Sequence, residues 1–199
     1  MISISHYVAA WAASPFAGVE LPWIATQQAE ELVRAAISGL GDDYRISEGI
    51  ATHHLARIEE GAVVKSPAII GRDCFVAANA YLRGGVYLER NCIIGPAAEL
   101  KTSFMFAGSK IAHLNFVGDS ILGEGVNVEA GAMIANYRNE KTDKRIRIRL
   151  DGGVIDTGVD KFGALVGDDS RIGANAVIAP GALLAPGSRI GRLELVDQS

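Results

Sequence analysis

The chain has 199 residues, of which 49% are apolar and 21% are charged, and its formal net charge is −4. These values fit one globular domain and exclude wholesale disorder. An acidic balance disfavours general binding to nucleic acid or to a membrane surface. No apolar run is long enough for a membrane span and the N-terminus lacks the pattern of a signal peptide, so we expect a cytoplasmic protein.

Glycine is frequent, with 23 residues, whereas aromatic residues make up only 7% of the chain. A core with so few rings has to be filled by small and aliphatic side chains in a regular lattice. The two cysteines are too few for a disulfide framework, which is consistent with a reducing compartment.

The first 57 residues form an N-terminal segment that contains a predicted helix over residues 22–40. Pro22 suits the first turn of this helix and Gly39 suits its end. Its apolar side chains share one face: Ala25, Ala29, Leu32, Val33, Ala36, Ile37 and Leu40. Because a solenoid exposes a parallel edge at its first coil, we expect this helix to cap that edge.

A six-residue repeat occupies residues 58–192, and a short tail, residues 193–199, follows it. Large apolar residues recur at every sixth position, and four residues after each comes a mostly small one. The large positions are Ile58, Val64, Ile70, Val76, Leu82, Leu88, Ile94, Leu100 and Phe106, then Phe116, Leu122, Val128 and Ile134 after a slip of four residues, and finally Val166, Ile172, Ile178, Leu184 and Ile190. A period of six fits neither a helix nor a simple strand and is typical of a parallel β-helix built from hexapeptides.

The second interruption of the repeat, residues 135–163, has the pattern of a β-hairpin. Arg145, Arg147 and Arg149 alternate with Ile146, Ile148 and Leu150, and a glycine pair follows. The hairpin therefore has one basic face. That face could bind phosphate groups, or the hairpin could be an arm that stabilises an oligomer.

Three hexapeptides make one coil, so residues 18 apart stack about 4.8 Å from one another. Lys65, Arg83 and Lys101 have this spacing and are predicted to form an outward column of cations. Stacked like charges destabilise a sheet unless something neutralises them. A bound phosphate could do so, and so could ion pairs with Glu89 or Glu99. Cys74 and Cys92 have the same spacing in small inward positions, which predicts stacked, unreactive thiols in the core.

Of the four histidines, only His113 lies in the body of the repeat, which predicts no zinc site. His53 and His54 precede the repeat and are expected to face solvent. His113 lies in the four-residue slip of the pattern. A lone histidine is often a simple surface residue, but imidazole titrates near neutral pH and is suited to remove a proton from an amine or a hydroxyl.

Several motifs resemble the C-terminal acetyltransferase domain of bifunctional N-acetylglucosamine-1-phosphate uridyltransferases. They include Glu99-Leu100-Lys101, His113-Leu114, Val117-Gly118-Asp119, Val126-Asn127-Val128 and Asn136-Tyr137, and the resemblance covers about residues 65–195. This family belongs to the hexapeptide-repeat acyltransferases. The resemblance implies a left-handed β-helix, a homotrimer with its sites between subunits, and transfer of an acetyl group from acetyl-CoA to the amine of glucosamine 1-phosphate.

The resemblance also assigns roles to individual residues. It implies that His113 is the general base, that Arg83 and Lys101 bind phosphate, and that Asn127 contacts the sugar. Phe116 falls where the family has a substrate-binding tyrosine. The implied cofactor-binding positions are Ala130, Asn136, Tyr137 and Ala174. Glu129 stands where the family has a glycine.

The sequence therefore predicts a CoA-dependent acyltransferase that acts on an amino sugar phosphate or a nucleotide sugar. The chemistry requires neither a metal nor a covalent acyl-enzyme. Two alternatives remain open. One is O-acylation of UDP-N-acetylglucosamine, as in the lipid A acyltransferases. The other, which Glu129 favours, is a non-catalytic trimer that binds a sugar nucleotide and assists a separate nucleotidyltransferase.

Overall fold

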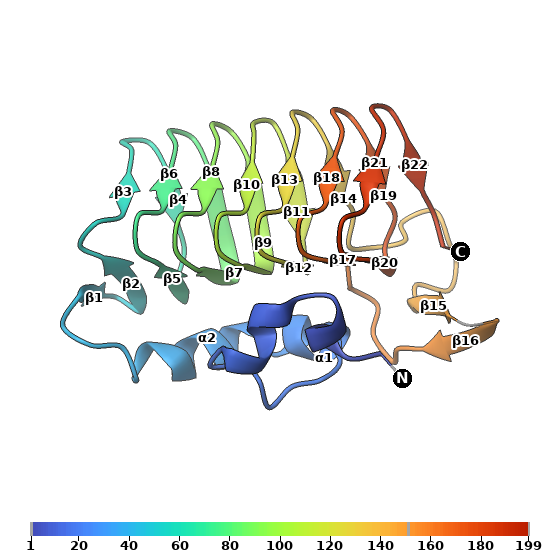
Figure 1. Ribbon diagram of the computed structural model, residues 1–199, viewed down its shortest axis with the longest axis horizontal. Coiled ribbons are helices and arrows are strands. Elements are labelled where there is room, and N and C mark those ends of the chain that lie inside the picture. Colours follow the sequence, from blue (N-terminus) through green and yellow to red (C-terminus); the bar gives the residue numbers. More distant parts are fainter. Residues whose placement is uncertain (1, 151, 199) are drawn as a thin grey trace.

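The computed structural model describes residues 2–150 and 152–198 and shows a left-handed parallel β-helix, as the hexapeptide period and the resemblance predicted (Figure 1). Its strands form three faces. Face 1 consists of β3 (Arg57–Ile58), β6 (Phe75–Val76), β8 (Ile93–Ile94), β10 (Lys110–Ile111), β13 (Asn127–Val128), β18 (Arg171–Ile172) and β21 (Arg189–Ile190).

Faces 2 and 3 share two long strands that bend around the edge between them, β7 (Tyr81–Leu88) and β9 (Glu99–Met105). Face 2 also contains β4 (Val63–Val64), β11 (Phe116–Gly118), β14 (Met133–Ile134), β19 (Val177–Ile178) and β22 (Leu195–Val196). Face 3 also contains β2 (Ile50–His53), β5 (Ala68–Ile70), β12 (Ile121–Leu122), β17 (Ala164–Val166) and β20 (Ala182–Leu184).

The β-helix begins earlier than the sequence predicted. Residues Ile50–Thr52 of β2 already pair in parallel with Ala68–Ile70 of β5, so the first coil starts near residue 50 and not at residue 58. The strand β1 (Tyr44–Ser47) runs antiparallel to β2 and covers its outer edge. A β-strand therefore protects the part of the first coil for which a helical cap was expected.

The interior of the β-helix is filled by aliphatic side chains, one methionine and two cysteines, and none of its buried members is aromatic. This confirms the lattice that the composition predicted. Cys74 and Cys92 are buried and free, as expected. The Cys92 thiol donates to the Phe106 carbonyl at 3.3 Å, and its contact with Cys74 together with burial raises the pKa of Cys92. Both thiols are therefore core groups.

The repeat does not slip by four residues. Glu99 pairs with Phe116 and Phe116 with Met133, so two successive coils have 17 residues instead of 18. Each short coil lacks one residue at the edge between faces 2 and 3, where Thr102 and Asp119 adopt positive φ values of 51° and 45°. Because of this shortening, the inward positions are Met105, Ile111 and Val117, and not Phe106 and Phe116.

The N-terminal helices lie along face 3 and do not cap the end of the first coil (Figure 1, blue). They are η1 (Ile4–His6), η2 (Ala9–Ala13), α1 (Pro22–Gln27) and α2 (Ala29–Ile37). The reason is the outward column of face 3, which is apolar throughout: Ala51, Ile69, Tyr87, Phe104, Ile121, Leu165 and Leu183. This column needs a cover along its whole length, and the helices supply it.

An aromatic cluster fastens the N-terminal segment to face 3. The Trp11 ring meets the Phe104 ring edge-on at 5.6 Å, and the Phe16 ring meets Phe104 at 4.9 Å. Gly85 allows the backbone of α2 to approach closely, because a Cβ there would lie 2.6 Å from the Glu30 nitrogen. Most of the few aromatic residues thus gather in a second core outside the β-helix.

The insertion forms the predicted hairpin from β15 (Arg147–Leu150) and β16 (Gly153–Asp156). Ile146 and Ile148 are fully buried, and Gly181 of the last coils lies against them. The arginines on the opposite side are exposed, so the basic face is confirmed. Within residues 2–150 and 152–198, no helix has both the length and the apolar character of a membrane span.

Candidate functional site

Every departure from the 18-residue coil lies at one edge of the β-helix, between faces 2 and 3. The two single-residue deletions occur there. The insertion also leaves from this edge, because it connects β14 on face 2 with β17 on face 3. Irregular turns can bring side chains together in arrangements that a regular repeat does not allow. This edge is therefore the strongest candidate for a functional site.

The predicted column of cations lies at this edge. The Lys65 amide donates to the Leu82 carbonyl at 2.8 Å, and Arg83 is in register with Lys101. Arg83 Nη2 lies 2.6 Å from Glu99 Oε1. The column is therefore partly neutralised by the Glu99 ion pair, one of the two alternatives that the sequence left open.

The second cation has a different partner, which the sequence analysis did not single out. Lys101 Nζ lies 2.7 Å from Asp119 Oδ2, and the side chains are only 16% and 7% exposed. The Asn136 side-chain amide also donates to Asp119. Asp119 therefore joins an expected phosphate ligand to an expected cofactor ligand. Asp119 directly follows Gly118, the residue in register with Lys101, so its place in the Val117-Gly118-Asp119 motif was the signal that could have found it.

Phe116 extends this cluster across face 2. A Cβ on Gly118 would lie 2.7 Å from Phe116 Cζ and 2.9 Å from Asn136 Cγ, so the ring and the amide both cover this glycine. Phe116, Asn136, Asp119 and Lys101 thus form one continuous patch.

A polar cleft of about 650 Å³ opens beside this patch. Gly84, Thr102 and Asp119 form its floor at the edge of the β-helix, and the helices α1 and α2 form one wall. The insertion supplies the opposite wall through Arg145 and residues 158–161. The volume falls in the range of small-molecule sites.

His113 lies at the other edge of face 2, toward face 1, in a regular turn. The Gly131 amide donates to the His113 carbonyl, and the Asn175 amide donates to the Ala130 carbonyl, both at 3.0 Å. These bonds stack the turns that contain His113, Ala130 and Ala174. The expectation that His113 marks a break in the lattice is wrong, but its side chain is exposed and is not committed to the core.

Glu129 occupies a position beside these turns. Its carboxylate accepts a hydrogen bond from the Ala174 amide at 3.0 Å and bonds with the Arg192 guanidinium at 3.0 and 3.2 Å. The hydrogen bond from the Ala174 N–H lowers the pKa of the Glu129 carboxyl most, and the hydrogen bond from Arg192 lowers it further. The substitution of a family glycine therefore has a structural consequence, because the Ala174 N–H has a partner within the chain.

One chain does not bring all the predicted site residues together. Arg83, Lys101, Asn136 and Tyr137 lie near the edge between faces 2 and 3, whereas His113 lies near the edge between faces 1 and 2. Lys101 is in register with Gly118, five residues after His113, so Lys101 and His113 lie at opposite sides of face 2. Asn127 projects from face 1 itself, in register with Lys110.

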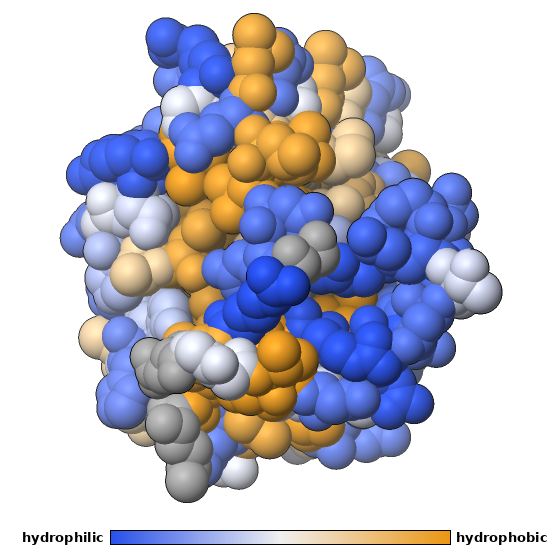
Figure 2. All heavy atoms as spheres, turned by 90° about the vertical axis from the view of Figure 1, so that its right-hand side faces the viewer, coloured by the Kyte–Doolittle hydropathy of each residue, from blue (hydrophilic) through white to orange (hydrophobic). Residues whose placement is uncertain are grey.

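The outward column of face 2 is apolar and largely uncovered in the single chain. Met133 is 42%, Val177 41% and Leu195 65% exposed, and Glu99 interrupts the column. The view onto the end of the β-helix shows apolar surface gathered in a band beside charged groups (Figure 2). The surface between the two groups of site residues is thus suited to contact another protein surface.

The remaining histidines form no metal centre. In the described part of the chain, no three side chains of the His, Cys, Asp and Glu types converge as metal ligands would. The expectation that His53 faces solvent is wrong. The residue is only 8% exposed, and its ring accepts a hydrogen bond from the Leu55 amide at 3.0 Å and packs edge-on against Tyr44.

Two stretches of the chain match known repeat families. Residues 67–102 match the bacterial transferase hexapeptide (six repeats), and residues 163–191 match the hexapeptide repeat of succinyl-transferase.

Full-length relatives are similar over much of this chain. It is 34% identical over 154 residues to the bifunctional sugar-1-phosphate nucleotidylyltransferase/acetyltransferase of Sulfurisphaera tokodaii, a match that covers 77% of this chain and 38% of that protein. It is 33% identical over 142 residues to the bifunctional protein GlmU of Synechococcus sp. (strain CC9902), covering 70% of this chain and 27% of that protein. The chain therefore spans well under half the length of these relatives.

Among solved structures, the chain is similar to the Arabidopsis UDP-N-acetylglucosamine acyltransferase. The TM-score is 0.39 and the identity 13%, over 72% of this chain and 58% of that one.

Proposed function

We propose that this hexapeptide-repeat protein is a CoA-dependent acyltransferase that acts on an amino or hydroxyl group of a sugar phosphate or nucleotide sugar. The main support is the arrangement on face 2: an exposed imidazole borders one side of this face and two cations border the other. The sequence similarity to a protein named as a sugar-1-phosphate nucleotidylyltransferase/acetyltransferase extends over 154 residues and covers both groups of residues.

His113 is the proposed general base. An acceptor amine or hydroxyl has to lose a proton as it attacks a thioester, and imidazole is suited to take it near neutral pH. No hydrogen bond or ion pair of the described residues occupies the His113 ring, so both its nitrogens are open to a substrate.

Arg83 and Lys101 are the proposed ligands of the acceptor's phosphate. Arginine and lysine are the usual protein partners of phosphate. Both cations already have carboxylate partners, so a phosphate has to displace or share the contacts with Glu99 and Asp119. Binding then replaces one anion by another and leaves no cation unpaired.

The acyl donor is proposed to be acetyl-CoA or another acyl thioester, which supplies the activated acyl group. Ala130, Asn136, Tyr137 and Ala174 are the positions that the resemblance offers for it. Tyr137 is 38% exposed, and the other three are partly exposed, so all four can be reached from solvent. The Ala174 amide can serve a ligand only after the exposed Glu129 side chain rotates away.

The active particle is proposed to be a homotrimer. Face 3 is covered by the chain's own helices, whereas face 2 has an apolar outward column and site residues at both its edges. If face 2 of each chain packs near its neighbour, His113 of one chain can meet Lys101 of the next. Cyclic symmetry closes such a heterologous contact.

A second candidate is a non-catalytic module that binds a sugar nucleotide beside a separate nucleotidyltransferase. The observation in its favour is Glu129, which occupies the Ala174 amide and pairs with Arg192. Glu129→Gly separates the two candidates. In an enzyme the substitution frees the amide and lowers the KM for acetyl-CoA, whereas a binding module shows no turnover in either form.

Turnover tests the proposal directly. The purified protein is given acetyl-CoA with a panel of amino sugar phosphates and UDP-sugars, and release of the free thiol is followed. Transfer to at least one acceptor is expected. No turnover on any acceptor, together with binding of a UDP-sugar, supports the second candidate.

A further inference from the structure

We propose that the insertion forms a binding site for an organic diphosphate in its basic groove, defined as the space lined by Arg138, Lys141, Arg145, Arg147 and Arg149. CoA and a nucleotide sugar both contain a diphosphate, and the choice of these two ligands rests on the proposed function. The existence of an anion site in the groove does not depend on the proposed function.

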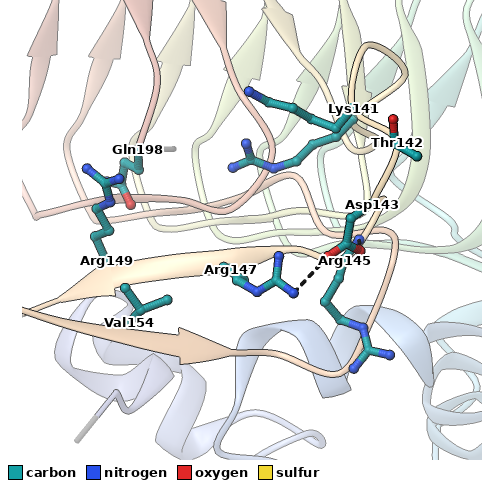
Figure 3. Close-up of a pocket in the computed structure, with 9 residues that line it drawn as sticks. Lys141, Thr142, Asp143, Arg145, Arg147, Arg149, Val154 and Gln198 are labelled. Atoms are coloured by element: carbon teal, nitrogen blue, oxygen red, sulfur yellow. Dashed lines mark hydrogen bonds and ion pairs between the residues drawn. The ribbon is translucent and has the colours of Figure 1, made fainter.

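The basic groove has a volume of about 400 Å³ and lies between β15, the loop before it and Gln198 (Figure 3). Five of its lining side chains are cationic, and Asp143 is the one carboxylate that joins them. Arg147 and Arg149 project from the exposed side of the same strand (Figure 3). The size fits a small organic anion.

Acidic side chains neutralise only part of this charge. Arg147 Nη2 lies 2.8 Å from Asp143, and Arg145 approaches Asp156 at 3.5 Å and Asp160 at 4.0 Å. Over residues 2–150 and 152–198, neither Arg138 nor Lys141 has a carboxylate within ion-pair distance. The groove therefore has a net positive charge.

The buried guanidinium of Arg138 is the strongest support for an anion site in the groove. The residue is only 6% exposed, and its guanidinium donates to the Pro180 carbonyl at 3.0 Å. Its Nε has no hydrogen-bond partner. A buried guanidinium without an anion is costly, because it loses water and gains no counter-charge. An anion in the groove would supply the missing charge and a hydrogen-bond acceptor.

The groove is held in place before any ligand binds. Ile146 and Ile148 are buried beside Gly181, and the Arg138 bond to Pro180 ties the loop to the same coil. Several planar guanidinium groups around one groove are suited to a diphosphate, whose two phosphates can each take hydrogen bonds from more than one cation. Preorganisation lowers the entropic cost of binding.

Calorimetry at low ionic strength with three probes tests this site: inorganic pyrophosphate, CoA and UDP-N-acetylglucosamine. The variants are Arg138→Met and Lys141→Met, with Arg72→Met as a matched control. Arg72 is an exposed arginine that pairs with Asp73 far from the groove. We expect each groove variant to lose about tenfold or more in affinity for pyrophosphate, and the control to bind as the wild type does.

The organic probes identify the source of the diphosphate. Tighter binding of CoA than of the UDP-sugar assigns the groove to the acyl donor, and the reverse assigns it to the acceptor. Lys141 is exposed, so Lys141→Met keeps the test valid if Arg138→Met fails to fold.

Two results would overturn the site: no binding of any probe at millimolar concentration, or equal binding by the wild type and both variants. These results differ from a failure of the proposed function. If only the function is wrong, turnover is absent but pyrophosphate binding still depends on Arg138 and Lys141. If only the groove is wrong, turnover persists with an unchanged KM in Lys141→Met.

Discussion

At the scale of single residues, His113 is the position where a substitution should change the rate of catalysis without changing the stability of the fold. Its side chain is exposed, and only its backbone carbonyl takes part in the stacked turns. His113→Ala should therefore lower turnover by about 10²–10⁴-fold, because the general base is lost, while the melting temperature stays unchanged. Steady-state rates and thermal unfolding measure the two effects. Equal rates in the wild type and the variant would remove His113 from the mechanism.

Arg83 and Lys101 allow a second test at this scale, because Lys65 in the same column is a built-in control. Arg83→Met and Lys101→Met should each raise the KM for a phosphorylated acceptor by about tenfold or more, through loss of a charge-assisted contact. Lys65 is exposed and has no ion pair among the described residues, so Lys65→Met should change little. An equal rise in KM for all three variants would indicate a nonspecific electrostatic effect of the surface charge and would contradict a specific phosphate site.

At the scale of elements, the close contact between α2 and β7 depends on Gly85. This glycine has a φ of +84°, and a Cβ would lie 2.6 Å from the backbone nitrogen of Glu30. Gly85→Ala should destabilise the fold by about 2 kcal/mol or more, because it adds a clash to the cost of a left-handed backbone.

Gly187 provides the matched control for this contact. It has a φ of +75°, but a Cβ there would meet nothing within 4 Å, so Gly187→Ala incurs the backbone cost alone. Chemical denaturation of both variants measures the difference. A loss in Gly85→Ala no larger than in Gly187→Ala would show that α2 is not held against β7 in solution.

The hairpin should loosen in acid. The Arg147 hydrogen bond lowers the pKa of Asp143, and the Gly158 N–H lowers the pKa of Asp156. A carboxyl with a lowered pKa in the folded state stabilises that state above its unfolded pKa and loses this effect as the pH falls. Amide hydrogen exchange of β15, corrected for intrinsic rates, should thus accelerate below about pH 4 relative to β11. Constant relative protection down to pH 2.5 would contradict this account.

At the scale of the whole molecule, the sequence predicted the regular part of the structure and missed what lies outside the lattice. The six-residue period determines which side chains fill the β-helix, and a period is visible in the sequence itself. The placement of the N-terminal helices was not predicted, because the column from Ala51 to Leu183 is apparent only when every third hexapeptide is aligned. The two 17-residue coils moved Phe106 and Phe116 outward for the same reason: the deletions lie at one edge, which a linear pattern does not reveal.

The candidate site was predicted only in part. The cation column follows from the 18-residue stacking, but the buried partner Asp119 and the separation of His113 from Lys101 depend on how coils close in space. That separation leads to the central claim: each site is completed by a neighbouring chain.

Complementation between two impaired variants, assayed at an acceptor concentration well below the KM, tests this claim most directly. His113→Ala and Lys101→Met chains are co-expressed with different tags, and mixed trimers that carry both tags are assayed for acyl transfer. If each site combines His113 of one chain with Lys101 of the next, one of the three sites in every trimer that carries both tags has both residues intact, and turnover should return to about a third of the wild-type value. If both residues act within one chain, no intact site forms. Mixed trimers no more active than the two parents, beside an active wild type, would contradict the account.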